Sequence, residues 1–429
     1  MTHSNGDAMN DIKKKIISCM DDYDPDALTV EKAREAILAC LSPIEGVERV
    51  AVRSSLGRIL AEDVISPIDV PAHDNSAMDG YALRGADLKP DCETRLREVG
   101  VAYAGRAYEG EVKPGECVRI MTGAVMPRGT DTVVIQEVVD RDGDVVIVPP
   151  GEKPGQNVRS AGEDLASGKP ALKAGTLVRP AELGLMASLG MAEVAVRRRL
   201  RVAFFSTGDE LASVGSVLKE GEVYDSNRYT LYGMLARMGA ELIDMGVVRD
   251  DRASLEQAFL QASAHADVVI TSGGVSVGEA DYTRELLERL GEVLFWKIAM
   301  KPGRPMAFGR IGKAWFFGLP GNPVAVMVTF YQFVRDALFT LAGRGGDFRV
   351  PLLQVPCASA MRKRPGRTEF QRGILYCEGG RWQVRVTGSQ GSGVLRSMSE
   401  ANCFIVLEHE RGSVQPGELV SVQVMDGLV

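Results

Sequence analysis

The sequence has few of the residues and runs that mark disulfide-rich, zinc-binding or membrane proteins. Its seven cysteines include no CxxC pair, and its four histidines share no helical spacing. These spacings argue against a disulfide framework and against a zinc site. The polar N-terminus has no signal-peptide hydrophobic region, and no apolar run approaches the ~20 residues of a membrane span. The sequence therefore predicts a soluble, cytoplasmic protein.

The chain also lacks a surplus of positive charge, since 50 Lys and Arg stand against 57 Asp and Glu, for a net charge of −7. This balance disfavours binding to nucleic acid or to anionic membranes, which needs a basic surface. The sequence contains no GxxxxGK and no clean GxGxxG, so neither a P-loop NTPase nor a nicotinamide enzyme is indicated. Its length of 429 residues predicts several domains.

Glycine, by contrast, is abundant, at 47 of 429 residues against a usual share of ~7%. Three short apolar runs each end in a glycine-containing segment, and amphipathic helical patterns lie between or after them. This alternation predicts βαβ units and a central parallel sheet with helices on both faces. The apolar runs span residues 200–205, 267–270 and 315–319, and the helical patterns span residues 229–238, 255–265, 282–290 and 324–341.

The three glycine-containing segments are residues 207–211 (TGDEL), 271–281 (TSGGVSVGEAD) and 319–323 (LPGNP). Ligands of an open parallel sheet bind beyond the carboxyl ends of its strands. Glycine lets the backbone approach an anion there, and a following helix offers free N–H groups. One such loop is more often a steric strand end than a site, but three loops at one sheet edge favour a binding site for an anion.

Carboxylates accompany these loops at Asp209, Glu210 and Asp281. Their oxygens suit either Mg²⁺ held together with phosphate, or the N–H edge of a pterin, and the residues alone leave both uses open. Asp225 and Asp251 are instead predicted to be helix N-caps or solvated surface charges.

Three cations, Lys297, Lys301 and Arg304, follow in residues 295–309 (FWKIAMKPGRPMAFG). On a single strand, Lys297 and Lys301 would share one face, which predicts a site for a diphosphate or another oxyanion. The alternative is a pair of exposed lysines on an edge strand.

The flanking regions have a different pattern. Residues 1–26 are polar and aperiodic, as expected of a flexible tail, and a helix is predicted over residues 28–41 with Thr29 as its N-cap. Short β-rich runs separated by glycine turns predict a β-dominated module over residues 66–154 and a sandwich or barrel over residues 349–429.

Two polar loops stand out in the β-dominated module. Residues 71–85 (PAHDNSAMDGYALRG) carry many hydrogen-bonding groups, as binding loops do, and Thr122 precedes a glycine in residues 119–134. Residues 161–164 (AGED) form a further acidic turn.

Taken in order, these strings resemble the molybdopterin molybdenumtransferase family, to which the C-terminal domain of gephyrin is related. The resemblance extends from about residue 27 to near the end of the chain. It is carried by DNSAMDGYA, RIMTGA, AGED, STGDEL, TSGGVSVGEADYT, FWKIAMKPGRP, FGLPGNPVA, KRPGRTEFQRG (363–373) and GSQGSGVLRSMSEAN (388–402). The one departure is Arg304, where relatives often carry Lys.

The resemblance implies an enzyme that takes adenylylated molybdopterin and molybdate with Mg²⁺, and releases AMP and molybdenum cofactor. It also implies a homodimer whose cleft combines the α/β domain of one subunit with the β-rich domain of the other. The fold class implied is multidomain α/β and β. Its parts are a flexible tail (1–26), an elongated linker domain in two segments (27–65 and 155–198), a β-rich, lid-like domain (66–154), a central parallel α/β molybdopterin-binding domain (199–348) and a C-terminal β-barrel (349–429).

Matching positions give the implied site residues. The catalytic set is Asp79, Thr122, Asp164, Glu210, Asp250 and Asp281, with Glu210 and Asp281 also as metal ligands. The substrate-binding set is Lys297, Lys301, Arg304, Ser272, Gly273, Gly274, Ser276, Pro320, Gly321, Asn322 and Pro323. Asp79, Thr122 and Asp164 would approach from the partner subunit.

Two alternatives remain. One is the adenylyltransferase of the same pathway, which shares the α/β fold and is also a possible partner for substrate channelling. The other is a non-catalytic scaffold like gephyrin. The sequence does not distinguish molybdate from tungstate, since both are tetrahedral dianions of similar size.

Overall fold

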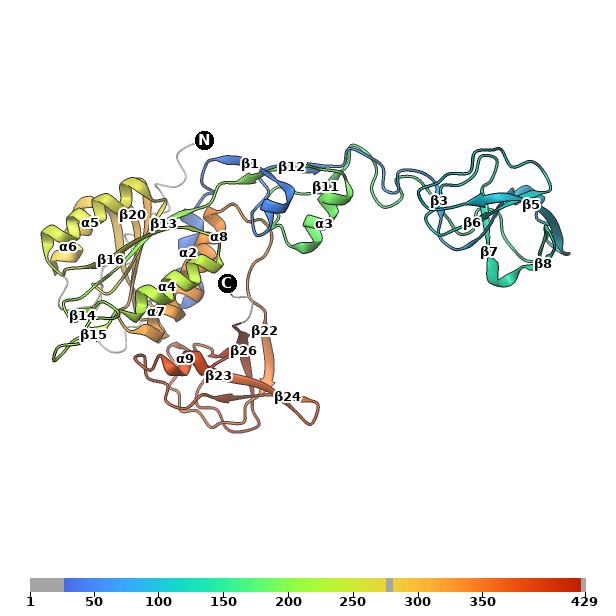
Figure 1. Cartoon of the computed structure of the whole chain (residues 1–429). Coiled ribbons are helices and arrows are strands. Elements are labelled where there is room, and N and C mark those ends of the chain that lie inside the picture. Colours follow the sequence, from blue (N-terminus) through green and yellow to red (C-terminus); the bar gives the residue numbers. More distant parts are fainter. Residues whose placement is uncertain (1–26, 275–280, 426–429) are drawn as a thin grey trace.

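The computed structural model describes residues 27–274 and 281–425. Figure 1 shows an elongated molecule, with a mixed α/β unit and a C-terminal β unit at one end and a second β-rich unit at the other. A narrow region that contains α3 (Pro180–Ser188), β1 (Val47–Ala51) and β12 (Glu193–Arg197) lies between them. The chain is therefore multidomain α/β and β, as predicted.

The α/β unit is built on a six-stranded sheet of order β16-β13-β17-β21-β20-β18. The strands are β16 (Glu241–Val248), β13 (Arg201–Thr207), β17 (Val268–Ser272), β21 (Ala314–Leu319), β20 (Pro305–Ile311) and β18 (Gly291–Lys297). The first four are parallel to one another, as predicted, but β20 is antiparallel to both of its neighbours.

The prediction of a wholly parallel sheet is therefore wrong at one edge. Ile311 pairs with Ala314, so only two residues connect β20 to β21, and Gly312 between them has a φ of 57°. A two-residue hairpin makes its strands antiparallel, and the left-handed backbone that such turns need is accessible to glycine.

Helices cover both faces of this sheet, as predicted (Figure 1). Val202 and Phe204 of β13 face one core, whereas Ala203 and Phe205 face the other, because successive strand side chains point to opposite faces. The first core is completed by α4 (Ser226–Arg237) and by the run of α7 (Pro323–Thr329), a π-helical turn (Phe330–Val334) and α8 (Arg335–Leu341). The second core is completed by α5 (Arg252–His265) and α6 (Asp281–Leu290).

The N-terminal helix α2 (Val30–Cys40) also packs on the first core, through Val30, Ala33 and Ile37. Its N-cap is Thr29, whose hydroxyl accepts from the N–H of Lys32 at 3.3 Å, as predicted. Among the described residues, one helical run, Pro323–Leu341, is long and apolar enough to cross a membrane, but 78% of it is buried inside the protein. It is a core helix of the α/β unit.

The β-rich unit contains a six-stranded sheet of order β7-β4-β6-β5-β9-β8. Its strands are β4 (Gly80–Leu83), β5 (Thr94–Ala102), β6 (Glu116–Ile120), β7 (Thr132–Ile135), β8 (Asp140–Asp142) and β9 (Val145–Val148). After β7 ends at Ile135, the chain continues as a 3₁₀ turn (Gln136–Val138). Short antiparallel pairs join this unit to the rest of the chain: β3 (Asn75–Ser76) with β10 (Val158–Arg159), β2 (Val64–Ile65) with β11 (Pro170–Leu172), and β1 with β12.

The C-terminal unit is a sheet of order β19-β23-β25-β26-β22, with β24 also paired to β23. Its strands are β22 (Leu352–Pro356), β23 (Thr368–Glu378), β24 (Arg381–Val386), β25 (Cys403–Leu407) and β26 (Leu419–Val424), with helix α9 (Arg396–Glu400). The first strand, β19 (Met300–Lys301), belongs to the chain segment just after β18, and it pairs in parallel with Thr368 and Glu369 of β23.

This pairing corrects the prediction for Lys297 and Lys301. Lys297 is the last residue of β18, in the α/β sheet, whereas Lys301 lies in β19, in the C-terminal sheet. The two lysines therefore do not share the face of one strand.

Candidate active site

The described parts of the three glycine loops converge at the carboxyl ends of β13, β17 and β21, which are neighbours in the sheet. They line a cavity of about 1120 Å³. Small-molecule sites commonly measure ~300–1,000 Å³, so this cavity suits a large ligand. The predicted residues that line it are Glu210, Asp250, Ser272, Gly273, Gly274, Lys301, Arg304, Pro320, Gly321, Asn322 and Pro323.

Close backbone contact between two of the loops depends on Gly273. This residue has a φ of 90°, and a Cβ built on it would lie 2.4 Å from the carbonyl oxygen of Thr207. Glycine is thus required here both by conformation and by space. The contact brings the loop after β17 against the loop after β13 at the floor of the cavity.

A cluster of buried polar side chains holds these loops in place through hydrogen bonds. Ser206 donates to Asp225 at 2.9 Å, and its hydroxyl lies 3.2 Å from that of Ser272. Asp225, which is 1% exposed, accepts from the backbone N–H of Arg228 and is the N-cap of α4, as predicted. Asn227 donates its side-chain N–H to the carbonyl of Gly321 at 2.7 Å, which ties the third loop to α4.

Two acidic residues of the loops, Glu210 and Asp250, line the cavity and are together called its carboxylate wall. Glu210 follows β13, and Asp250 follows β16. The Thr207 hydroxyl donates to Asp250 at 3.4 Å, and the backbone N–H of Asp250 donates to Asp209 at 3.4 Å. Among the described residues, no three Asp, Glu, His or Cys side chains gather closely enough to hold a metal ion by themselves.

Three cations also line the cavity, and together they are called its cationic wall. Lys301 and Arg304 come from β19 and the turn after it, and Arg367 comes from the residue before β23. Arg367 donates to Glu369 at 3.0 Å, and the Glu369 side chain is 2% exposed. Because Glu369 is fixed within the sheet, it orients the Arg367 side chain at the cavity edge.

Sequence reasoning assigned no role to Arg367 or to the loop Gln390–Gly393, which also lines the cavity. Both lie in strings that carry the family resemblance, residues 363–373 and 388–402. The glycine and serine content of the second string was the available signal for a further anion-binding loop.

Three predicted residues of the α/β region are not placed in the cavity. Lys297 does not line it. Ser276 lies outside the described residues, and Asp281 is the first residue of α6, with a side chain outside the described part of the structure.

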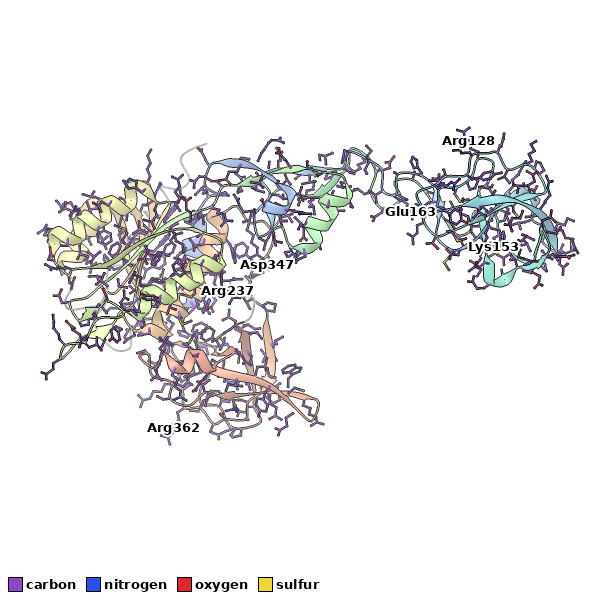
Figure 2. All side chains as sticks on the ribbon, viewed as in Figure 1. Arg128, Lys153, Glu163, Arg237, Asp347 and Arg362 are labelled. Carbon is purple, nitrogen blue, oxygen red and sulfur yellow. The ribbon has the colours of Figure 1, made fainter. Side chains whose placement is uncertain are left out.

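The predicted residues of the β-rich unit lie far from this cavity within one chain. Figure 2 shows Glu163, the neighbour of Asp164, well apart from Arg237 at the end of α4. Asp79 and Thr122, however, are in direct contact, since Asp79 accepts from both the N–H and the hydroxyl of Thr122.

Comparisons with known proteins match the chain almost from end to end. Residues 28–190 match a family model described as MoeA N-terminal region (domain I and II), residues 203–340 one described as probable molybdopterin binding domain, and residues 354–425 one described as MoeA C-terminal region (domain IV).

Relatives and a solved structure agree with these matches. A molybdopterin molybdenumtransferase of Haemophilus influenzae is 45% identical over 94% of this chain and 100% of its own length. Gephyrin of Dictyostelium discoideum is 33% identical over 91% of this chain and 61% of its own length. The crystal structure of a molybdopterin biosynthesis moeA protein from Pyrococcus horikoshii has a TM-score of 0.80 at 29% identity, over 93% of this chain and 100% of that one. The chain therefore belongs to the molybdopterin molybdenumtransferase family.

Proposed function

We propose that this chain inserts molybdenum, supplied as molybdate, into adenylylated molybdopterin, with release of AMP and molybdenum cofactor. The observation that carries the proposal is that one cavity is lined both by carboxylates, Glu210 and Asp250, and by cations, Lys301, Arg304 and Arg367. An anionic, phosphorylated pterin that reacts with an oxyanion needs cationic groups for its charges and acceptors for its N–H edge.

A buried acceptor in the cavity supports a pterin. The side-chain oxygen of Asn227 has no hydrogen-bond partner in the described structure, although its N–H group is bonded to Gly321. Asn227 lines the cavity. Since a buried polar atom without a partner is costly, a ligand N–H that reaches this oxygen would be bound favourably.

The carboxylate wall fits Mg²⁺, which prefers hard oxygen ligands and keeps several waters. Glu210 and Asp250 would supply two of these oxygens, and substrate phosphate and water the others. Asp281, which begins the helix after the second loop, stays a candidate ligand. The chemistry that Mg²⁺ supplies is neutralisation of phosphate charge as the phosphoanhydride is broken.

The remaining catalytic candidates, Asp79, Thr122 and Asp164, would reach the cavity from the partner subunit of a homodimer. Two observations support this proposal. These residues lie far from the cavity of their own chain (Figure 1), and two hydrogen bonds from Thr122 fix the orientation of Asp79. The β-rich unit would then act as a lid on the partner's site.

The domain bounds are proposed as they follow from the sequence. A hydrogen bond from the N–H of Ala358, just after β22, to the carbonyl of Val384 in β24 links the two ends of the C-terminal sheet at 2.8 Å, which supports a closed barrel. The proposed units are the tail (1–26), the elongated linker domain (27–65 and 155–198), the β-rich domain (66–154), the molybdopterin-binding domain (199–348) and the barrel (349–429). The protein would act in the cytoplasm, where the adenylyltransferase of the same pathway is a candidate partner.

The test is turnover with defined substrates. Purified protein is incubated with adenylylated molybdopterin, molybdate and Mg²⁺, and AMP release and reconstitution of a molybdenum-free apoenzyme are measured. Both are expected. Formation of adenylylated molybdopterin from molybdopterin and ATP would instead identify an adenylyltransferase, and binding without consumption a scaffold. Equimolar molybdate and tungstate, followed by metal analysis of the product, determine the preferred oxyanion.

A further inference from the structure

Arg372, within β23, is buried without a counter-ion. Its side chain is 1% exposed, and its guanidinium donates to the hydroxyl of Ser397 and to the carbonyl of Gly391, each at 3.0 Å. No carboxylate among the described residues accepts from it. A buried charge with neutral partners is costly and is normally replaced or paired. Burial lowers the pKa of Arg372 to about 10, which still leaves the group charged near neutral pH.

This residue also anchors the loop Gln390–Gly393, which lines the cavity. The backbone N–H of Arg372 donates to the side chain of Gln390 at 2.7 Å, and the Gln390 amide donates back to the carbonyl of Arg372 at 3.2 Å. The carbonyl of Ser392 accepts from the N–H of Val324 at 3.1 Å. The loop Gln390–Gly393 is thus fastened through Arg372 on one side and through α7 on the other.

The orientation of this loop has an electrostatic consequence. The carbonyls of Gly391 and Ser392 are both directed at protein donors, and no backbone N–H of Gln390–Gly393 donates to an acceptor in the described part of the chain. Free N–H groups and a nearby buried cation make the potential at this loop positive, and the loop lines the cavity. The field of that cation is weakly screened because water is excluded around it.

We propose that Arg372 is a positioning residue for the molybdate oxyanion, which holds the loop Gln390–Gly393 in its anion-binding orientation and adds its buried charge to the positive potential of that loop without touching the substrate. This inference rests on the proposed function. It accounts for a buried cation that packing alone does not require.

The chain offers a matched control in Lys363. It is a second buried cation of the C-terminal unit, 6% exposed, and it donates to the carbonyls of Arg364, His409 and Arg411. Lys363 does not line the cavity. Loss of its charge should affect folding of the unit as loss of Arg372 does, but should leave the oxyanion site unchanged.

The experiment compares steady-state turnover of the full-length wild type with Arg372→Gln, Arg372→Lys and Lys363→Met. Arg372→Gln keeps a hydrogen-bond donor but removes the charge, and we expect it to raise KM for molybdate about tenfold while KM for the pterin substrate changes less than about twofold. Arg372→Lys keeps the charge and should stay within about threefold of wild type. Lys363→Met should lower Tm but leave both KM values unchanged. Should Arg372→Gln not fold, Ser397→Ala removes one acceptor of Arg372 and is expected to raise KM for molybdate about threefold.

A wild-type KM for molybdate in Arg372→Gln, or in Ser397→Ala where it serves as the replacement, would overturn the proposal. An equal rise in Lys363→Met, or an equal rise in both KM values of Arg372→Gln, would also overturn it. Failure of the proposed function has a different signature, namely no molybdenum cofactor from the wild type. Calorimetric titration of wild type and Arg372→Gln with molybdate alone then decides the role of Arg372. About tenfold weaker binding supports it, and equal binding refutes it.

Discussion

Thr122 donates both its backbone N–H and its hydroxyl to the same carboxylate oxygen of Asp79, at 2.7 and 2.8 Å. These two bonds lower the pKa of Asp79, the backbone bond most strongly. Asp79 is thus an oriented, ionised carboxylate on an exposed loop. Such a group can accept a hydrogen bond from a substrate or a water, which fits the proposal that it serves the site of a partner subunit.

Mixed dimers test whether the site is shared. Asp79→Asn and Glu210→Gln should each lower turnover by about 100-fold or more, because each removes a charge from the reacting region. Co-expressed with different tags and purified as mixed dimers, the two variants should recover up to half of wild-type turnover, since one of the two clefts then has both residues intact. Absence of recovery in mixed dimers would place both residues in the same subunit's site.

Glu210 is expected to control the requirement for Mg²⁺. Glu210→Gln should raise the Mg²⁺ concentration for half-maximal turnover by about tenfold or more, because a neutral amide is a weaker ligand for a hard cation. The control is Glu220→Gln, an exposed acid that does not line the cavity. Turnover measured at increasing MgCl₂ concentration gives the half-maximal Mg²⁺ concentration of each variant. An identical requirement in wild type and Glu210→Gln would remove Glu210 from the metal site.

Gly273→Ala should disrupt the floor of the cavity. The new Cβ would lie 2.4 Å from the Thr207 carbonyl in a backbone of φ 90°, so the loop must move. We expect a destabilisation of ~2–3 kcal/mol and loss of turnover. Gly215→Ala is matched to it, since Gly215 has a φ of 92° and no atom within 4 Å of its Cβ position. That variant incurs the conformational cost alone and should retain turnover. Thermal unfolding and activity assays compare the two.

The ion pair of Arg198 with Asp267 should make the free energy of unfolding depend on pH in the acidic range. Burial raises the pKa of Asp267, but the bonds from Arg198 and from the backbone N–H of Arg201 outweigh burial and hold it below its usual value. Because the pKa of Asp267 is lower in the folded state than in the unfolded state, the carboxylate stabilises the folded protein at pH values above the unfolded pKa of ~3.9. This stabilisation is lost as the pH falls through the pKa of the folded state.

Asp267→Asn should therefore lower Tm at pH 7, and its difference from wild type should shrink as pH falls below about 4. The control is Glu241→Gln, which removes the ion pair between the exposed side chains of Glu241 and Arg201. This variant should change Tm little at either pH. Scanning calorimetry from pH 3 to 7 measures the difference. A Tm difference that is constant with pH would contradict the assignment.

The parts of the fold that the sequence predicted have a local cause. β13, β17 and β21 are buried on both faces, so each forms an uninterrupted apolar run that ends in glycine. The N-cap Asp225 lies three residues before Arg228, whose N–H it accepts, and such caps are set by adjacent sequence.

The parts that were missed depend on contacts between distant segments. β20 follows Lys301 after the Pro302-Gly303 pair and is joined to β21 by a two-residue turn at Gly312, and neither signal was used to predict that the chain reverses. The cationic wall joins Lys301 with Arg367 through the pairing of β19 with β23. No local pattern at either end encodes that pairing, and so Lys297 was included in the wall and Arg367 was left out.

The pairing of Met300 and Lys301 with β23 also constrains how this chain can be divided. Thr368 donates its N–H to the carbonyl of Ala299 at 2.9 Å, so the first strand of the C-terminal sheet is supplied by sequence that precedes the sheet by more than fifty residues. A fragment cut at the apparent boundary near residue 349 would have an unpaired edge on β23, beside the cavity. Chimeras that exchange this unit between relatives should therefore carry residues 299–301 from the same parent.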